Sequence, residues 1–226
     1  MRPCVNLENI IEEERQALMA EYAFPLSPGR VHAPPYCAIP HFDVLRNTPS
    51  ALRARHPVRV EELPGKRPGQ AFVQSCPSLN YKFLWTHVDN DNYREDYVTF
   101  LREHHGLKLQ ALPRNLHVDH LFNRARARFL QLNYIRMILL PDSINMQYGA
   151  GYEKSRTQGG FGREGRERGI DEVLLMKIWG VSCPRQGMPL TPPMLAHLHH
   201  MAITFGIPAS ELERNVRELM DVAAAR

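Results

Sequence analysis

Apolar side chains recur at helical spacing near the start of the chain and then give way to a proline-rich stretch. The apolar residues at positions 7, 10, 11, 18 and 19 fall near a period of 3.6 residues, which predicts an amphipathic helix over Leu7–Tyr22. From Phe24 to Pro77 the chain contains ten prolines, and prolines at this density forbid long helices. We therefore expect an irregular N-terminal wrap with short extended pieces such as Val58–Val60.

A strand and a helix are predicted in the next part of the chain. Ser78–Val88 is rich in aromatic and apolar residues, which is typical of a strand, and the four polar residues after it favour a turn. A helix is expected over Tyr93–His105, with Asn92 as its N-cap and Glu95 at the spacing of a capping box. Gly106 would end this helix in the left-handed conformation.

The middle of the chain follows the order strand, Asp-His pair, basic segment, strand, helix. Leu116–His120 is predicted to be a short strand, and Tyr134–Leu140, with the sequence YIRMILL, a buried one. The segment Leu121–Asn133 between them, rich in Arg and Ala, is a loop or a short helix. A proline and an aspartate then turn the chain into a helix around Ser143–Lys154.

The C-terminal third is predicted to be helical, with helices over Asp171–Trp179, Pro192–Phe205 and Glu211–Ala223. The chain then divides into an N-terminal helix with its proline-rich wrap (1–77), a region that holds the two central strands and a basic loop (78–169), and a C-terminal helical region (170–226). The expected fold class is α+β, in which a small ββα-like element is embedded in a mostly helical scaffold with a proline-rich N-terminal wrap.

Composition narrows the class of protein. The 226 residues are 43% hydrophobic and 23% charged, as in ordinary globular proteins. The sequence has no run of eighteen apolar residues, so we expect no membrane-spanning helix, and its acidic start does not fit a signal peptide. The cysteines at positions 4, 37, 76 and 183 form no Cys-x-x-Cys pair, which argues against a zinc ribbon. We expect a cytoplasmic protein, with signal-less export left open.

The net charge of +4 is unevenly distributed along the chain. Between Arg114 and Arg168 there are ten Lys or Arg residues against five Asp or Glu residues, an excess of five positive charges. A nearly neutral body with one basic quarter suggests a polyanionic partner such as DNA. A solvated, arginine-rich surface would produce the same charge distribution.

The segment Asn115–Arg156 resembles the ββα-metal nucleases, the HNH or His-Me finger superfamily. The resemblance rests on the Asp-His pair at the end of the first strand, the Ser-Ile-Asn step at the start of the helix, and the Glu-Lys pair that follows. In that family a strand-end histidine activates water, and an acidic neighbour shares one divalent metal with a side chain of the following helix. An asparagine before the second strand orients the histidine.

Carried onto this chain, the resemblance implies that His120 is the general base and that Asn133 orients it. Asp119 and Asn145 would bind a divalent metal, Mg²⁺ or Mn²⁺. Lys154 or Arg136 would neutralise charge that develops on the phosphate. The basic side chains nearest the site would contact DNA: Arg124, Arg126, Arg128 and Arg156.

Elementary chemistry supports this division of roles. A histidine with a pKa near 6.5 can accept a proton from water at neutral pH, and a hard cation needs only a few oxygen ligands because it keeps several waters. Adjacent strand residues point to opposite faces, so Asp119 and His120 could share one site only where the backbone turns. The chain also departs from the family, which often has a histidine where Asn145 stands and zinc-knuckle cysteines that are absent here.

The same residues have structural interpretations. The Asp-His pair can be a capped turn, Asn145 a helix N-cap, and Glu153-Lys154 a surface pair. A different class of function is indicated by Met201–Leu219, which looks like the last two helices of a helix-turn-helix, with Arg214 and Arg217 on the polar face of the second helix.

The function predicted from the sequence is a metal-dependent endonuclease that hydrolyses phosphodiester bonds in DNA, such as a toxin or a defence effector. An immunity or regulatory protein is a candidate partner. The alternative is a non-catalytic DNA-binding protein or a protein-binding adaptor. A nuclease needs a divalent metal and degrades DNA, whereas a binding protein retains DNA without the metal and leaves it intact.

Overall fold

The chain folds into strands and helices that are interspersed along the sequence, with the last three elements all helical. The computed structural model describes residues 6–23, 35–47, 58–77, 80–153, 164–184, 188–205 and 207–224. The strands are β1 (Tyr36–Ile39), β2 (Arg59–Glu62), β3 (Ala71–Cys76), β4 (Tyr81–His87), β5 (Leu116–His120), β6 (Tyr134–Pro141) and β7 (Arg168–Gly169). The helices are α1 (Leu7–Ala23), α2 (Asp43–Asn47), α4 (Tyr93–His105), α5 (Arg124–Phe129), α6 (Asp142–Tyr148), the π-helical η2 (Gly149–Glu153), α7 (Glu172–Ile178), α8 (Pro192–Phe205) and α9 (Ala209–Ala224).

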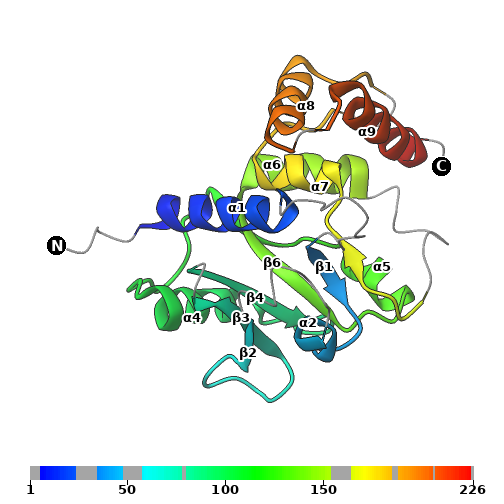
Figure 1. The fold of residues 1–226 in the computed structure, drawn as a ribbon. Helices are drawn as coiled ribbons and strands as arrows, with labels where there is room; N and C mark the ends of the chain where they lie inside the picture. Colours follow the sequence, from blue (N-terminus) through cyan, green and yellow to red (C-terminus); the bar gives the residue numbers. More distant parts are fainter. Residues whose placement is uncertain are drawn as a thin grey trace.

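One antiparallel sheet of seven strands organises the described residues (Figure 1). Its order is β2-β3-β4-β6-β1-β7, and β5 pairs with β6 alone. The expectation of a mostly helical scaffold around a small two-stranded element is therefore wrong. β5, β6 and α6 do follow one another as a ββα unit, but β6 also pairs with β1 and β4, so the unit is one part of a larger sheet.

Three strands of this sheet come from the stretch that was expected to be an irregular wrap. β1, β2 and β3 form there because the prolines that the structure describes lie beside strands or in turns, where a missing N–H donor costs no ladder hydrogen bond. Pro40 follows β1 directly, Pro64 and Pro68 lie between β2 and β3, and Pro77 follows β3. Strands from residues 36–76 thus pair with strands from residues 81–141.

β6 has hydrophobic cores on both of its faces. Met137 and Leu139 pack with β3, β4 and α4, whereas Ile138 and Leu140 pack with the helices of the C-terminal half. This alternation follows from the period of two along a strand. Figure 1 shows α4 below the sheet, α1, α6 and α7 above it, and α8 and α9 stacked beyond them. None of the described helices has both the length and the apolar run needed to span a bilayer.

The local predictions for α4 had mixed outcomes. The helix spans Tyr93–His105 as expected, and Gly106 ends it in the left-handed conformation with φ of 70°. The capping box is wrong, because the Asn92 side chain makes no capping hydrogen bond. Instead, Asn90 folds the preceding turn: its Oδ1 accepts the Asn92 N–H at 2.9 Å, and its Nδ2 donates to Asp96 at 2.7 Å.

Helix α1 is held against the sheet partly by a buried carboxyl group. Glu14 is 3% exposed, and its Oε1 accepts a hydrogen bond from the Tyr97 hydroxyl of α4 at 2.9 Å. Its second oxygen has no hydrogen-bond partner among the described residues. Burial raises the pKa of Glu14 from 4.5 to about 8, so the neutral acid is the favoured form inside the fold at neutral pH.

The raised pKa of Glu14 predicts a specific loss of stability with rising pH. The unfolded chain ionises Glu14 near pH 4.5, whereas the folded chain keeps it neutral up to about pH 8. Its contribution to the free energy of unfolding is therefore full below pH 4.5 and is lost as the pH rises to 8, by up to about 1.4 kcal/mol per pH unit. Glu14→Gln should gain stability over the wild type across this window in urea denaturation. The control Glu13→Gln changes the exposed neighbour and should have the same stability as the wild type at each pH. An effect of Glu14→Gln that is equal at pH 5 and pH 8 would contradict the raised pKa of Glu14.

The buried position of β6 predicts a second stability effect. Ile135 is fully buried, whereas Ile203 on α8 is 83% exposed. Ile135→Ala should lower the free energy of unfolding by about 2–5 kcal/mol, because it removes apolar contacts and leaves a cavity. Ile203→Ala, the same chemical change at the surface, should stay within about 0.5 kcal/mol. Equal losses in the two variants would show that β6 does not form the core.

Candidate functional site

Two carboxylates and one lysine meet where β5, η2 and α7 come together. The ammonium group of Lys177 donates to Asp119 Oδ2 at 2.5 Å and also to Glu153 Oε1. Lys177 is fully buried, and the side chains of Asp119 and Glu153 are 15% and 13% exposed. We call these three residues the Lys177 triad. They lie far apart in the sequence, so only the fold brings them together.

The backbone that carries the triad is fixed by hydrogen bonds on both sides. Asp171 caps α7 by accepting the N–H of Leu174 at 2.8 Å, a stabilising arrangement at a helix start. The Tyr152 hydroxyl donates to the other oxygen of Asp171 at 2.7 Å. η2 is therefore joined to α7 twice, through Tyr152 at the start of the helix and through Glu153 at Lys177. These contacts fix the position of Glu153 relative to Lys177.

Burial and charge act in opposite directions on the triad. Burial disfavours the charged form of Lys177, but the charges of Asp119 and Glu153 outweigh it and raise the lysine pKa above its ordinary value. Burial also raises the pKa of Glu153, against the stabilising charge of Lys177. The lysine is thus held as a cation between two carboxyl groups. Ionisable groups perturbed in this way are frequent at functional sites, although structural ion pairs show the same effect.

A small recess opens beside Glu153. It has a volume of about 30 Å³, room for one or two water molecules. Arg126 lines it together with Asn123, whose Oδ1 accepts the Arg126 N–H at 3.1 Å and so caps α5. The guanidinium of Arg126 lies 5.3 Å from the ring centroid of Phe122. Two acidic residues, Glu153 and Asp171, therefore line one small space together with an arginine and an asparagine.

His120 lies on the other face of β5 from Asp119. Its ring packs against Tyr93 of α4 with the centroids 4.5 Å apart, and its Nε2 has no hydrogen-bond partner among the described residues. Burial lowers its pKa to about 3, assisted by positive charges, that of Arg124 first. His120 is therefore neutral at pH 7 but a weak proton acceptor, since an efficient base has a pKa near the working pH.

The arginines of α5 point in two directions. Arg124 and Arg128 are one helical turn apart and both reach the turn after β4. Arg124 bonds Asp91 at 2.9 Å, Arg128 bonds Asp89 at 2.7 Å, and both donate to the Val88 carbonyl. Arg126, on the opposite side of the helix, lines the recess at Glu153. The three proposed phosphate contacts thus do not form one surface.

The remaining predicted site residues that the structure describes have contacts or exposure of their own. Asn133 donates to the carbonyl of Pro40 at 2.8 Å. Arg136 is buried in the sheet, where it donates to Gln74 at 3.2 Å and lies 4.2 Å from the ring centroid of Phe83. Asn145 is partly exposed on α6. Lys154 and Arg156 lie outside the described residues.

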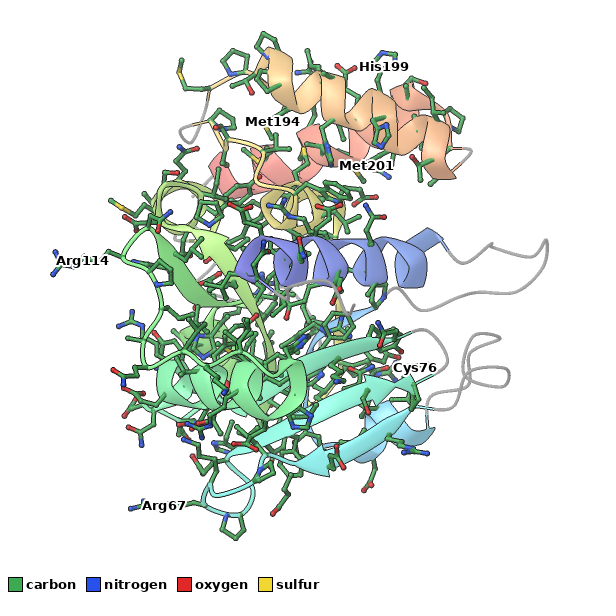
Figure 2. All side chains as sticks on the ribbon, turned by 90° about the vertical axis from the view of Figure 1, so that its left-hand side faces the viewer. Arg67, Cys76, Arg114, Met194, His199 and Met201 are labelled. Carbon is green, nitrogen blue, oxygen red and sulfur yellow. The ribbon has the colours of Figure 1, made fainter. Side chains whose placement is uncertain are left out.

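The alternative helix-turn-helix segment forms a pair of adjacent helices, α8 and α9. Arg217 pairs with Glu213 at 2.7 Å, and Arg214 lies 4.0 Å from Glu218, all on α9. Figure 2 shows Met194 and Met201 pointing from α8 toward the body of the protein and His199 pointing away. The described cationic side chains of α9 are therefore partly neutralised within their own helix.

Sequence reasoning missed two members of the triad. Lys177 stands in the apolar run Val173–Trp179, and a lone charge in such a run indicates a buried ion pair, because an unpaired buried charge is strongly disfavoured. Glu153 had been interpreted as part of a surface pair. Nothing local to Glu153 distinguishes the two cases, since its burial depends on α7.

The triad predicts that removing the lysine charge alone destabilises the fold much more than removing all three charges. Lys177→Met alone should lower the free energy of unfolding by about 3–5 kcal/mol, because two buried carboxylates would lose their cation. Adding Asp119→Asn and Glu153→Gln to the same chain should recover most of that loss, since neutral groups need no partner charge. Urea denaturation of both variants gives the comparison. A triple variant as unstable as the single one would mean that packing, and not charge, explains the loss.

Comparison with known proteins identifies no relative: no protein-family model, no curated protein and no solved structure matches the chain significantly.

Proposed function

We propose that this chain is a metal-dependent phosphodiesterase that cleaves DNA and that the Lys177 triad is its catalytic centre. The observation that carries the proposal is the convergence of Asp119 and Glu153 on a fully buried lysine beside a recess lined by Arg126. Glu153 belongs both to the triad and to the lining of the recess, so it links the carboxylates and the ammonium to the Arg126 side. Carboxylates, an ammonium and a guanidinium are the groups that bind and neutralise a phosphoryl group and its cation. The assignment keeps Asp119 from the sequence-based prediction and replaces His120 and Asn145.

The two carboxylates fit a hard divalent cation. Asp119 Oδ2 and Glu153 Oε1 both accept from the Lys177 ammonium, so the cation would bind the remaining oxygen of each carboxylate. Mg²⁺ and Mn²⁺ take oxygen ligands and keep several waters, so two carboxylates suffice. Within the described ranges no group of three His, Cys, Asp or Glu side chains is arranged for a metal; water and substrate would complete the coordination. When bound, the cation would stabilise charge on the phosphate and lower the pKa of a coordinated water.

The protein's own groups have separate roles in this proposal. Asp119 and Glu153 would hold the cation, and Lys177 limits their mutual repulsion while adding positive charge near the phosphate. Arg126 would bind a phosphate oxygen in the recess, where a guanidinium can donate two parallel hydrogen bonds. Tyr152 and Asp171 join η2, which carries Glu153, to the start of α7, the helix that carries Lys177. DNA as the substrate rests on the basic quarter of the chain between Arg114 and Arg168, which contains Asp119, Arg126 and Glu153.

Plasmid cleavage with added Mg²⁺ or Mn²⁺ tests the assignment. Asp119→Asn and Glu153→Gln should each lower the cleavage rate by about 10²-fold or more. Each variant leaves Lys177 one carboxylate, so the buried charges stay balanced and the fold should persist, which circular dichroism checks. Glu211→Gln, an exposed carboxylate on α9, should cleave like the wild type.

The same assay separates the competing assignments. His120→Gln should retain most of the activity, because its buried ring is a weak base. Loss of cleavage in His120→Gln, with Glu153→Gln active, would overturn the triad and restore the ββα-metal arrangement. A wild type that shifts DNA equally with and without the metal and leaves it intact would favour the non-catalytic DNA-binding alternative.

A further inference from the structure

A second, larger cavity lies on the α4 side of β5, outside the Lys177 triad. It is a cleft of about 650 Å³ bounded by α4, the segment between α4 and β5, and β5 itself. Cavities that bind small molecules have volumes of about 300–1,000 Å³. We call it the cationic cleft for the three arginines along it: Arg94, Arg102 and Arg114.

The wall opposite α4 is anchored to the core. Leu107, Leu109 and Leu112 of the connecting segment pack against the hydrophobic cluster beneath α4. On the helix side, Arg94, Val98 and Arg102 are spaced four residues apart and so share one face of α4. The cleft is therefore formed by packed structure on both sides and does not depend on a free loop.

The cleft combines an apolar lining with a positive rim. Its apolar lining residues are Val98, Ala111, Leu112, Pro113, Leu116 and Val118. All three arginines are exposed, and Figure 2 shows Arg114 projecting away from the body of the protein. His117 adds a further nitrogen donor, 3.3 Å from Asp142, whereas Glu95 is the one carboxylate among the described lining residues.

The arginines are held loosely enough to accept a ligand. Arg102 contacts Glu103, its exposed neighbour, at 2.9 Å, and a surface pair of this kind contributes little. The guanidinium of Arg94 lies 5.4 Å from the ring centroid of Tyr93. By contrast, Arg124 and Arg128 are bound to aspartates and a carbonyl of the turn after β4. The guanidinium groups of Arg94 and Arg102 thus make fewer and weaker contacts within the fold than those of Arg124 and Arg128.

We propose that the cationic cleft binds a nucleotide unit, with the phosphate on the arginines and the base on the apolar lining. Guanidinium groups match phosphate oxygens in a bidentate geometry, which accounts for the rim. Inorganic phosphate alone would leave the apolar lining in contact with water, and the volume suits a ligand with a larger body. The unit is either a free nucleotide or the terminal nucleotide of a DNA strand. The proposal does not depend on catalysis at the Lys177 triad.

Isothermal titration in EDTA tests this proposal with three probes: inorganic phosphate, dAMP and a 5′-phosphorylated tetranucleotide. dAMP or the tetranucleotide should bind at least about tenfold more tightly than phosphate, the scale of one added favourable contact. The double variant Arg94→Gln with Arg114→Gln should lose at least about tenfold in affinity for them. Val98→Gln should weaken the nucleotide probes and leave phosphate binding unchanged.

The controls separate this site from general charge. Arg214→Gln with Arg217→Gln removes the same charge from α9 and should bind as the wild type does. Equal affinity for dAMP and the tetranucleotide identifies a free nucleotide as the ligand, and tighter binding of the tetranucleotide identifies a strand end. The proposal is overturned if neither nucleotide probe binds more tightly than phosphate, or if the α9 variant loses as much affinity as the cleft variant.

Discussion

The pairing of β6 with three other strands is the constraint on which the rest of the structure depends. Its first residues pair with β1 and β4, and its last five pair with β5. A strand in this position is covered on both faces, so its sequence is almost continuously apolar instead of alternating. The exception is Arg136, whose charge is accommodated between Gln74 and the rings of Phe83 and Trp85.

The register between β5 and β6 also determines which side chains of β5 can act together in one site. Asp119 is opposite Ile138 and His120 is opposite Met137, so the pleat sends the two side chains into different cores. Asp119 meets Lys177 above the sheet, and His120 meets Tyr93 below it. The two adjacent residues of the motif therefore lie in different environments. Asp119 is beside a charged lysine, whereas the Nε2 atom of His120 has no hydrogen-bond partner among the described residues.

The sequence was informative about local elements and much less so about their assembly. α4, β5 and β6 lie within a residue or two of the predicted positions, because periodicity and glycine signals are local. The sheet was missed because β1 pairs with β6 across almost a hundred residues, with Ala38 opposite Ile135. The periodicity of apolar residues is local and does not indicate which distant strands pair. The candidate site shows the same division. Asp119 was selected from a local motif, whereas Glu153 becomes a partner of Lys177 only once η2 and α7 pack together.

The two ends of the sheet path have a consequence for how the protein behaves at high concentration. At one end, β2 is short and largely exposed, and three of its four residues are charged: Arg59, Glu61 and Glu62. At the other end, β7 has only two residues, and Arg168 is one of them. Exposed strand edges are templates for pairing with other chains, and short length and charge are the usual protections. Short length and charge at both ends of this path therefore disfavour edge-to-edge stacking with another chain along the described strands β2 and β7.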